Sequence, residues 1–108
     1  MASSEAGAGS DTDPRLLVLA PGDNIAVARS EIAAGTGLSV AGRRVTLQRA
    51  LGFGHKIALR DIAAGEKIVK YGAPIGRATA AIALGAYVHN HNVASDYMPN
   101  TVAVEAAL

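Results

Sequence analysis

The fold of this chain is decided by the stretch Val27–Leu38 (VARSEIAAGTGL), which recurs as Ile57–Ile68 (IALRDIAAGEKI). A shorter third copy, IALGAYV, occupies Ile82–Val88. Each copy holds an isoleucine, two apolar residues and a glycine. Such a glycine supplies the positive φ of a tight connection. The repeat therefore predicts short strands joined by tight corners.

A helical interpretation of the alanine pairs has support, since alanine has the highest helix propensity. However, a glycine follows each pair, and no apolar pattern with a 3.6-residue period persists for three turns. We therefore expect a mostly β fold with little helix. The segment Val45–Leu51 stays open between a strand and one helical turn.

Length and composition indicate one compact domain. The chain has 108 residues, half of them apolar, and only four aromatic residues, so Ala, Val, Ile and Leu must build the core. Residues 1–13 are small and polar, which predicts a flexible segment. We expect the folded domain at residues 14–93 and an extension or tail at 94–108, where Thr101–Val104 is either an edge strand or part of the tail.

Composition also argues against several classes of protein. The net charge is +1 without a polybasic run, which disfavours nucleic-acid binding, and the absence of cysteine excludes disulfides and thiolate chemistry. The apolar run Leu16–Ala20 is too short to cross a membrane and lacks the preceding basic region of a signal peptide. We therefore expect a cytoplasmic protein that binds neither nucleic acid nor membranes.

The most concentrated chemistry is Val88–Asn92 (VHNHN). In a strand, His89 and His91 would point to the same face, where two neutral imidazoles can ligate a divalent metal and Asn92 can contact a substrate. The alternative is that these imidazoles are half-buried strand residues bonded to nearby carbonyls. A metal would need a third ligand, and the nearest carboxylate in sequence is Asp96.

Three further residues are candidates for binding a substrate anion. His55 and Lys56 follow a glycine-rich turn at a strand entrance, where Lys56 can neutralise an anion as a point charge. Arg77 can bind a carboxylate bidentately. A surface lysine beside a half-exposed histidine, and a solvated arginine, are the alternatives. No phosphate-binding loop, nucleophile elbow or helical zinc motif is present, so no complete active site is visible.

Taken together, five motifs resemble the SAF-type domain of the altronate and galactarate dehydratase family, to which the small subunit of sulfolactate sulfo-lyase also belongs. The similarity runs in unbroken order from about Pro21 to Val93. The motifs are Gly54–Leu59, Asp61–Glu66, Lys70–Gly72, Pro74–Thr79 and Val88–Asn92.

The resemblance implies a β-clip fold, a compact module of short strands folded over on itself. It implies that the domain stands at the N-terminus of a long dehydratase or as a small subunit beside a large one. Such enzymes remove water from sugar acids, or sulfite from sulfolactate, commonly with a divalent metal such as Fe²⁺. His89 and His91 match the family's His-x-His-Asn signature, which implies catalytic or metal contact, whereas His55 and Lys56 match as substrate contacts.

The resulting hypothesis is a lyase subunit or domain that is not active alone and that completes the active site of a large partner. The metal would be shared with that partner, and the chain could also form a homo-oligomer. Two alternatives remain: a non-catalytic SAF module that binds a ligand or an assembly partner, and a purely structural role.

Overall fold

The computed structural model describes residues 11–95, and within this range all regular secondary structure is β. The prediction of a mostly β fold with little helix is confirmed. The strands are β1 (Leu16–Leu17), β2 (Ile25–Ala28), β3 (Gly37–Val40), β4 (Arg43–Thr46), β5 (Lys56–Ala58), β6 (Lys67–Lys70), β7 (Ala73–Ala78), β8 (Tyr87–Val88) and β9 (Val93–Ala94).

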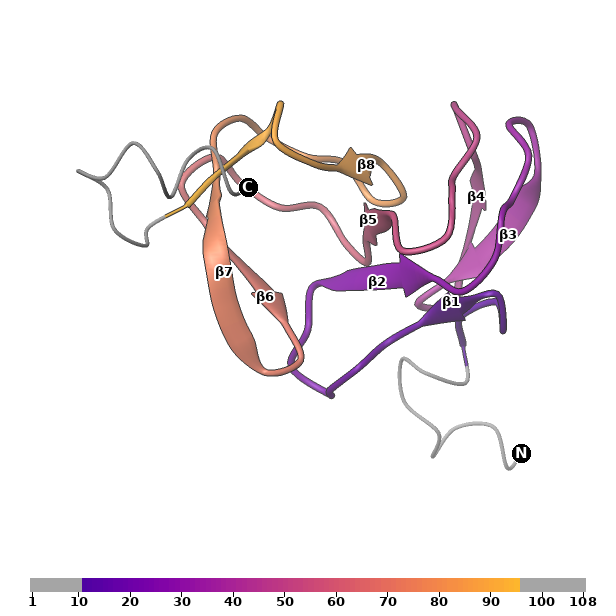
Figure 1. Ribbon diagram of the computed structural model, residues 1–108, viewed down its shortest axis with the longest axis horizontal. Coiled ribbons are helices and arrows are strands. Elements are labelled where there is room, and N and C mark those ends of the chain that lie inside the picture. Colours follow the sequence, from indigo (N-terminus) through magenta and orange to yellow (C-terminus); the bar gives the residue numbers. More distant parts are fainter. Residues whose placement is uncertain (1–10, 96–108) are drawn as a thin grey trace.

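A central sheet with the order β1-β2-β5-β8 joins two outer hairpins (Figure 1). The β3–β4 hairpin lies at one end of the molecule, and the β6–β7 hairpin, extended by β9, lies at the other. All strand pairs are antiparallel. The segment Val45–Leu51, left open from sequence, ends β4 at Thr46 and then follows an irregular path to a bridge at Leu51.

The repeated segments form the same tight corner, as the sequence predicts. Gly35, Gly65 and Gly85 have φ values of 85°, 85° and 81°. A fourth corner, which was not recognised among the sequence repeats, ends at Gly54, whose φ is also 85°. Its residues, Leu51–Gly54, share the apolar first position and the final glycine with the other copies, but Gly52 and Phe53 replace the two middle residues. The corner therefore depends on backbone conformation more than on the identity of the two middle residues.

The four corners associate in two pairs. Ile32 forms an isolated antiparallel bridge with Leu51, and Ile62 forms the equivalent bridge with Ile82. In each bridge the two backbones exchange N–H···O hydrogen bonds of 2.7–2.9 Å. The described chain thus consists of two similar halves, each built from two corners and one hairpin.

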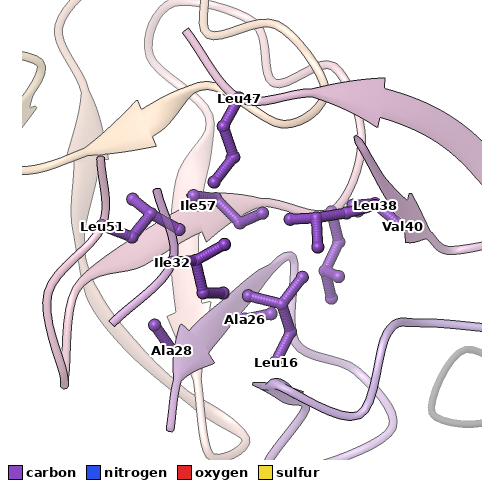
Figure 2. Packing of buried hydrophobic residues seen from close by; sticks show 10 residues of the cluster. Leu16, Ala26, Ala28, Ile32, Leu38, Val40, Leu47, Leu51 and Ile57 are labelled. Carbon is purple, nitrogen blue, oxygen red and sulfur yellow. The ribbon is translucent and has the colours of Figure 1, made fainter. Parts of the chain in front are cut away.

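Each half has its own core. The first cluster centres on Ile57, and Figure 2 shows its side chains converging from β2, β3, β5 and the corners. The second cluster contains Ile25, Ala58, Ile62, Ile68, Ala78, Ile82 and Val88. Adjacent residues of β5 face opposite clusters, because Ile57 belongs to the first and Ala58 to the second. The central sheet therefore separates two apolar layers.

The two hairpins turn through equivalent residue pairs. Both central residues have positive φ in Ala41-Gly42 (50° and 84°) and in Tyr71-Gly72 (56° and 77°), as in the type I′ turns that suit the twist of a hairpin. The Asp23 carboxylate accepts hydrogen bonds of 2.8 Å from the N–H groups of both Tyr71 and Gly72. The turn at Pro21–Asn24 thus stabilises the second hairpin.

The first hairpin is held by residues expected in the flexible segment. The Ala41 N–H donates to Thr12 Oγ1 at 2.9 Å, and the Gly42 N–H donates to the Asp11 carbonyl at 3.0 Å. Because Thr12 is buried, residues 11–13 pack with the domain, ahead of the expected start at Pro14. Residues 1–10 lie outside the described range.

At the other end, β9 pairs with β7 and brings the backbone over Gly76. A Cβ atom at Gly76 would lie 2.5 Å from the carbonyl oxygen of Ala94, so only glycine allows this approach. Residues 94 and 95, assigned to the extension or tail, are described here. Residues 96–108, including Thr101–Val104 and Asp96, lie outside the described range.

Candidate functional site

The two histidines of the VHNHN motif lie in a turn, so the prediction that they share a strand face is wrong. Strand β8 ends at Val88, and the Asn92 N–H donates to the His89 carbonyl at 3.0 Å, which closes a four-residue turn. The Asn92 side chain accepts from the His89 N–H and donates to the Tyr87 carbonyl, both at 2.9 Å. Asn92 therefore shapes the turn that carries both imidazoles.

Both imidazoles nevertheless gather on one side chain, Tyr87. The ring centroids of His89 and His91 lie 5.4 and 5.8 Å from that of Tyr87, with interplanar angles of 26° and 19°. The His55 ring lies 5.2 Å away at 55°, and Arg49 Cζ lies 4.1 Å above the ring. We call Arg49, His55, Tyr87, His89 and His91 the Tyr87 cluster.

Strand register explains how these residues meet. Tyr87 of β8 lies opposite Ile57 of β5, so both side chains share one face of the central sheet. His55 precedes Ile57 by two residues and occupies the same face by the alternation of an extended chain. The corner at Gly54 thus places His55 beside Tyr87, although His55 and Tyr87 are distant in sequence.

One ring nitrogen of His55 is already engaged. The Gly52 N–H donates to His55 Nδ1 at 2.9 Å, within the corner that Gly54 completes. An Nδ1 that accepts a hydrogen bond carries no proton, so the neutral ring carries its proton on Nε2. This contact orients the imidazole and leaves Nε2 for a ligand.

Lys56 lies on the opposite face, in a groove of about 210 Å³. Burial, and secondarily the charge of Lys70, lower the pKa of Lys56 below its usual value. His89 lines the same groove and therefore links it to the Tyr87 cluster. We call this the Lys56 groove; its lining residues are Lys56, Ile75, Val88, His89, Asn90, Val93 and Ser95.

The structure does not bring every candidate into this region. Arg77 is exposed on β7 and donates to the Gly65 carbonyl at 3.2 Å, at a corner of the second half. It lines neither the Lys56 groove nor the Tyr87 cluster. By contrast, His55, Lys56, His89 and Asn92 all lie around the β5–β8 pair.

The donor set fits a metal only in part. Among residues 11–95, no group of three or more His, Asp or Glu side chains is arranged to hold a metal ion. His89 and His91 provide two imidazoles, whereas protein metal sites typically use three or four ligands. A metal bound by these imidazoles would need further ligands from outside the described residues.

Two residues of the Tyr87 cluster were not identified from sequence. Tyr87 belongs to the third copy of the repeat, and its ring meets the imidazoles only because β8 pairs with β5. Arg49 lies in the irregular segment after β4 and has no motif around it. The one available signal in the sequence was the scarcity of aromatic residues, which makes each tyrosine a candidate for a specific contact.

The fold and this basic, aromatic site define a small β module with a candidate ligand-binding surface, and the family comparison agrees with that class. Residues 14–96 match the model of the altronate/galactarate dehydratase SAF domain. The chain belongs to this family.

Individual relatives come from two kinds of lyase. The chain is 53% identical over 70 residues to altronate dehydratase of Escherichia coli, which covers 65% of this chain and 14% of that protein. It is 48% identical over 44 residues to (2R)-sulfolactate sulfo-lyase subunit alpha of Chromohalobacter salexigens, covering 41% of this chain and 47% of the subunit. The corresponding subunit of Paracoccus pantotrophus is 37% identical over 49 residues, covering 45% and 73%.

The matched region thus spans about one seventh of the altronate dehydratases and a larger share of the sulfo-lyase alpha subunits. Within the described residues, no helix has the length and hydropathy of a membrane span.

Proposed function

We propose that this SAF domain serves a sugar-acid dehydratase of the altronate or galactarate type, or a sulfolactate sulfo-lyase, by completing the active site of a large catalytic part. The observation that carries the proposal is the Tyr87 cluster, which gathers three imidazoles and an arginine in a domain whose relatives belong to these lyases. The remaining catalytic groups would come from the large part.

The proposed chemistry is elimination next to a carboxylate. This reaction needs a base that removes a proton and a cationic environment that stabilises the enolate-like charge. In our proposal, His89 and His91 contact the substrate or a divalent metal, which would act as a Lewis acid when bound. His89 and Lys56 line one groove, so an anion held by Lys56 would lie near the His89 imidazole.

His55 and Asn92 have supporting roles in this proposal. The Nε2–H of His55 is directed by the hydrogen bond at Nδ1 and is available to a substrate oxygen. Asn92 holds the turn through both ends of its amide, so its contribution to a substrate contact is the placement of His89 and His91.

The test is reconstitution of the lyase. The chain is mixed with the large subunit or domain encoded beside it, and loss of altronate, galactarate or (2R)-sulfolactate is measured. We expect activity only from the mixture, and a loss of at least about 100-fold for the His89→Ala/His91→Ala double variant, in the range typical of acid–base groups. Lys67→Ala, an exposed change on β6, is the control and should retain the wild-type rate.

Two results would contradict the proposal. An unchanged rate in the double histidine variant would remove these imidazoles from the mechanism. No activity with any of the three substrates, together with no binding of the large part, would favour a non-catalytic binding or assembly module. Metal content of the mixture, compared between wild type and the double variant, reports separately on metal ligation.

A further inference from the structure

Arg49 occupies an unusual position for an arginine of this domain. Its Cζ atom lies 4.1 Å above the Tyr87 ring, within the range of a cation–π interaction. Arg15 and Arg60 form ion pairs with Asp13 and Glu66. Among residues 11–95, no hydrogen bond or ion pair is found for the Arg49 guanidinium. Its donors are therefore held in place by an aromatic ring while remaining available to an acceptor.

The surroundings of Arg49 are basic. The Tyr87 ring that carries it also contacts the imidazoles of His89 and His91. Glu31 lines a hollow together with Ala50 and His55, but no ion pair joins it to Arg49. A guanidinium in such an environment favours a bound anion, and its planar fork matches a carboxylate or sulfonate.

We propose that Arg49 binds an anionic group of the ligand beside His89 and His91, and that Tyr87 is the positioning residue that holds Arg49 there. The identification of this ligand as a sugar acid or sulfolactate rests on the proposed function. The binding of a small carboxylate or sulfonate by Arg49 does not, because it follows from the contacts of this chain alone.

Tyr87 has the central part in the arrangement. Its ring is the common contact of Arg49, His89 and His91, so the relative positions of these groups depend on it. The aromatic face, rather than the hydroxyl, makes these contacts. Tyr87→Phe therefore keeps the arrangement, whereas Tyr87→Leu keeps an apolar side chain on β8 but removes the surface on which Arg49 lies.

The experiment uses the full chain without a partner. Sodium galactarate, (2R)-sulfolactate and sulfate are added separately at constant ionic strength, with EDTA present, while the imidazole resonances of His89 and His91 are followed by NMR. We expect saturable shifts with galactarate, with (2R)-sulfolactate or with both. The order of their affinities distinguishes a preference for carboxylate from a preference for sulfonate. Response to sulfate alone, without either organic anion, would overturn the proposal.

The variants separate binding from positioning. Arg49→Met should weaken binding at least about tenfold, in line with loss of a charge-assisted bidentate contact. Arg44→Met is the matched control, because its guanidinium lies over Gly37 across the β3–β4 hairpin, and it should bind as wild type. Tyr87→Leu should weaken binding as Arg49→Met does, and Tyr87→Phe should not. Methyl shifts of Ile57 and Val88 report whether each variant is folded.

The proposal is overturned if Arg49→Met binds as tightly as wild type, or if none of the three anions gives saturable shifts. If Tyr87→Leu binds the anions as tightly as wild type, the positioning role of Tyr87 is refuted, and the role of Arg49 is not. These outcomes are independent of the reconstitution experiment. If the reconstituted mixture is active but Arg49→Met binds the anions as wild type does, the proposed function is sustained and this inference is refuted.

Discussion

The two halves of the domain share a scaffold but differ in chemistry. The corners at Gly35 and Gly65 are thirty residues apart, and those at Gly54 and Gly85 are thirty-one apart, with φ values of 81–85° in all four. Equivalent positions nevertheless carry different side chains. His55 and Lys56 of the first half correspond to Ala86 and Tyr87 of the second.

This difference shows where a repeated β module can acquire function. The corner geometry needs an apolar residue and a glycine, which leaves the residues after the glycine free to vary. In the first half these residues supply an imidazole and an ammonium group, and in the second they supply an aromatic ring. Because β5 pairs with β8, the two variable positions meet at the boundary between the halves.

The largest expected effect concerns the surroundings of equivalent corner glycines. Gly85→Ala should destabilise the chain by about 4 kcal/mol, since it combines a positive φ with a Cβ that would lie 2.4 Å from Val45 Cγ1. Gly54→Ala, at the equivalent position of the first half, has the same backbone strain with open space around it and should cost about 1–2 kcal/mol. Urea unfolding of both variants measures the difference. Equal losses would show that the corners are equivalent in packing as well as in backbone conformation.

The next effect compares the two hairpin turns. Asp23→Ala removes acceptors for the N–H groups of Tyr71, Gly72 and Ala20 and should cost about 3 kcal/mol. Thr12→Ala, at the first hairpin, removes the acceptor of the Ala41 N–H and should cost about 1 kcal/mol.

Chemical denaturation gives both values for the hairpin turns, and amide hydrogen exchange locates the loss. Faster exchange of the Tyr71 and Gly72 amides is expected in Asp23→Ala, with Asp23→Asn intermediate. Unchanged exchange at these amides would mean that the carboxylate does not hold the second turn.

The smallest effect is a difference in pH dependence between the corners. Glu66 accepts from the Arg60 guanidinium and from the Ala63 N–H, and these contacts, led by Arg60, hold the pKa of Glu66 below its usual value of 4.5. At the equivalent position, Thr36 donates its hydroxyl to the Ala33 carbonyl at 2.6 Å and carries no charge. Of these two corners, only the one at Gly65 should therefore lose stability in acid.

The sign follows from proton binding. A depressed pKa in the folded state means that the unfolded chain binds more protons, so the stabilisation by Glu66 is present above pH 4.5 and is lost as the pH falls through the folded value. The Tm difference between wild type and Glu66→Gln should be small at pH 7 and should vanish in acid. Thr36→Val should show a pH-independent difference, and a constant difference for Glu66→Gln would exclude the charged contact.

Much of the fold was predictable because the corner is a local structure. A glycine after an apolar pair specifies a positive φ without reference to the rest of the chain, which is why three corners and the mostly β class were recognised. The corner at Gly54 was missed because Gly52 and Phe53 hide its similarity to the alanine pairs. The hairpin turn at Ala41-Gly42 was missed as well, since alanine seldom adopts positive φ.

The candidate site was predictable only in part. Motifs identified His55, Lys56, His89 and His91 from their types and their resemblance to a family. The expectation of a strand through His91 was wrong because Asn92 bonds back to Tyr87 and closes a turn. A period-two pattern in sequence does not reveal such a side-chain contact with the backbone.

By itself, then, the sequence determined the repeated corner, the β class and the presence of basic residues near the motifs, since these depend on local backbone preferences and residue type. Only the tertiary structure decided that Arg49, His55 and the turn after β8 meet on Tyr87, and that Arg77 stays apart. The physical reason is strand register: β5 pairs with β8 through Lys56 and Val88 and through Ile57 and Tyr87, and pairing between residues so far apart in sequence leaves no mark in the local sequence.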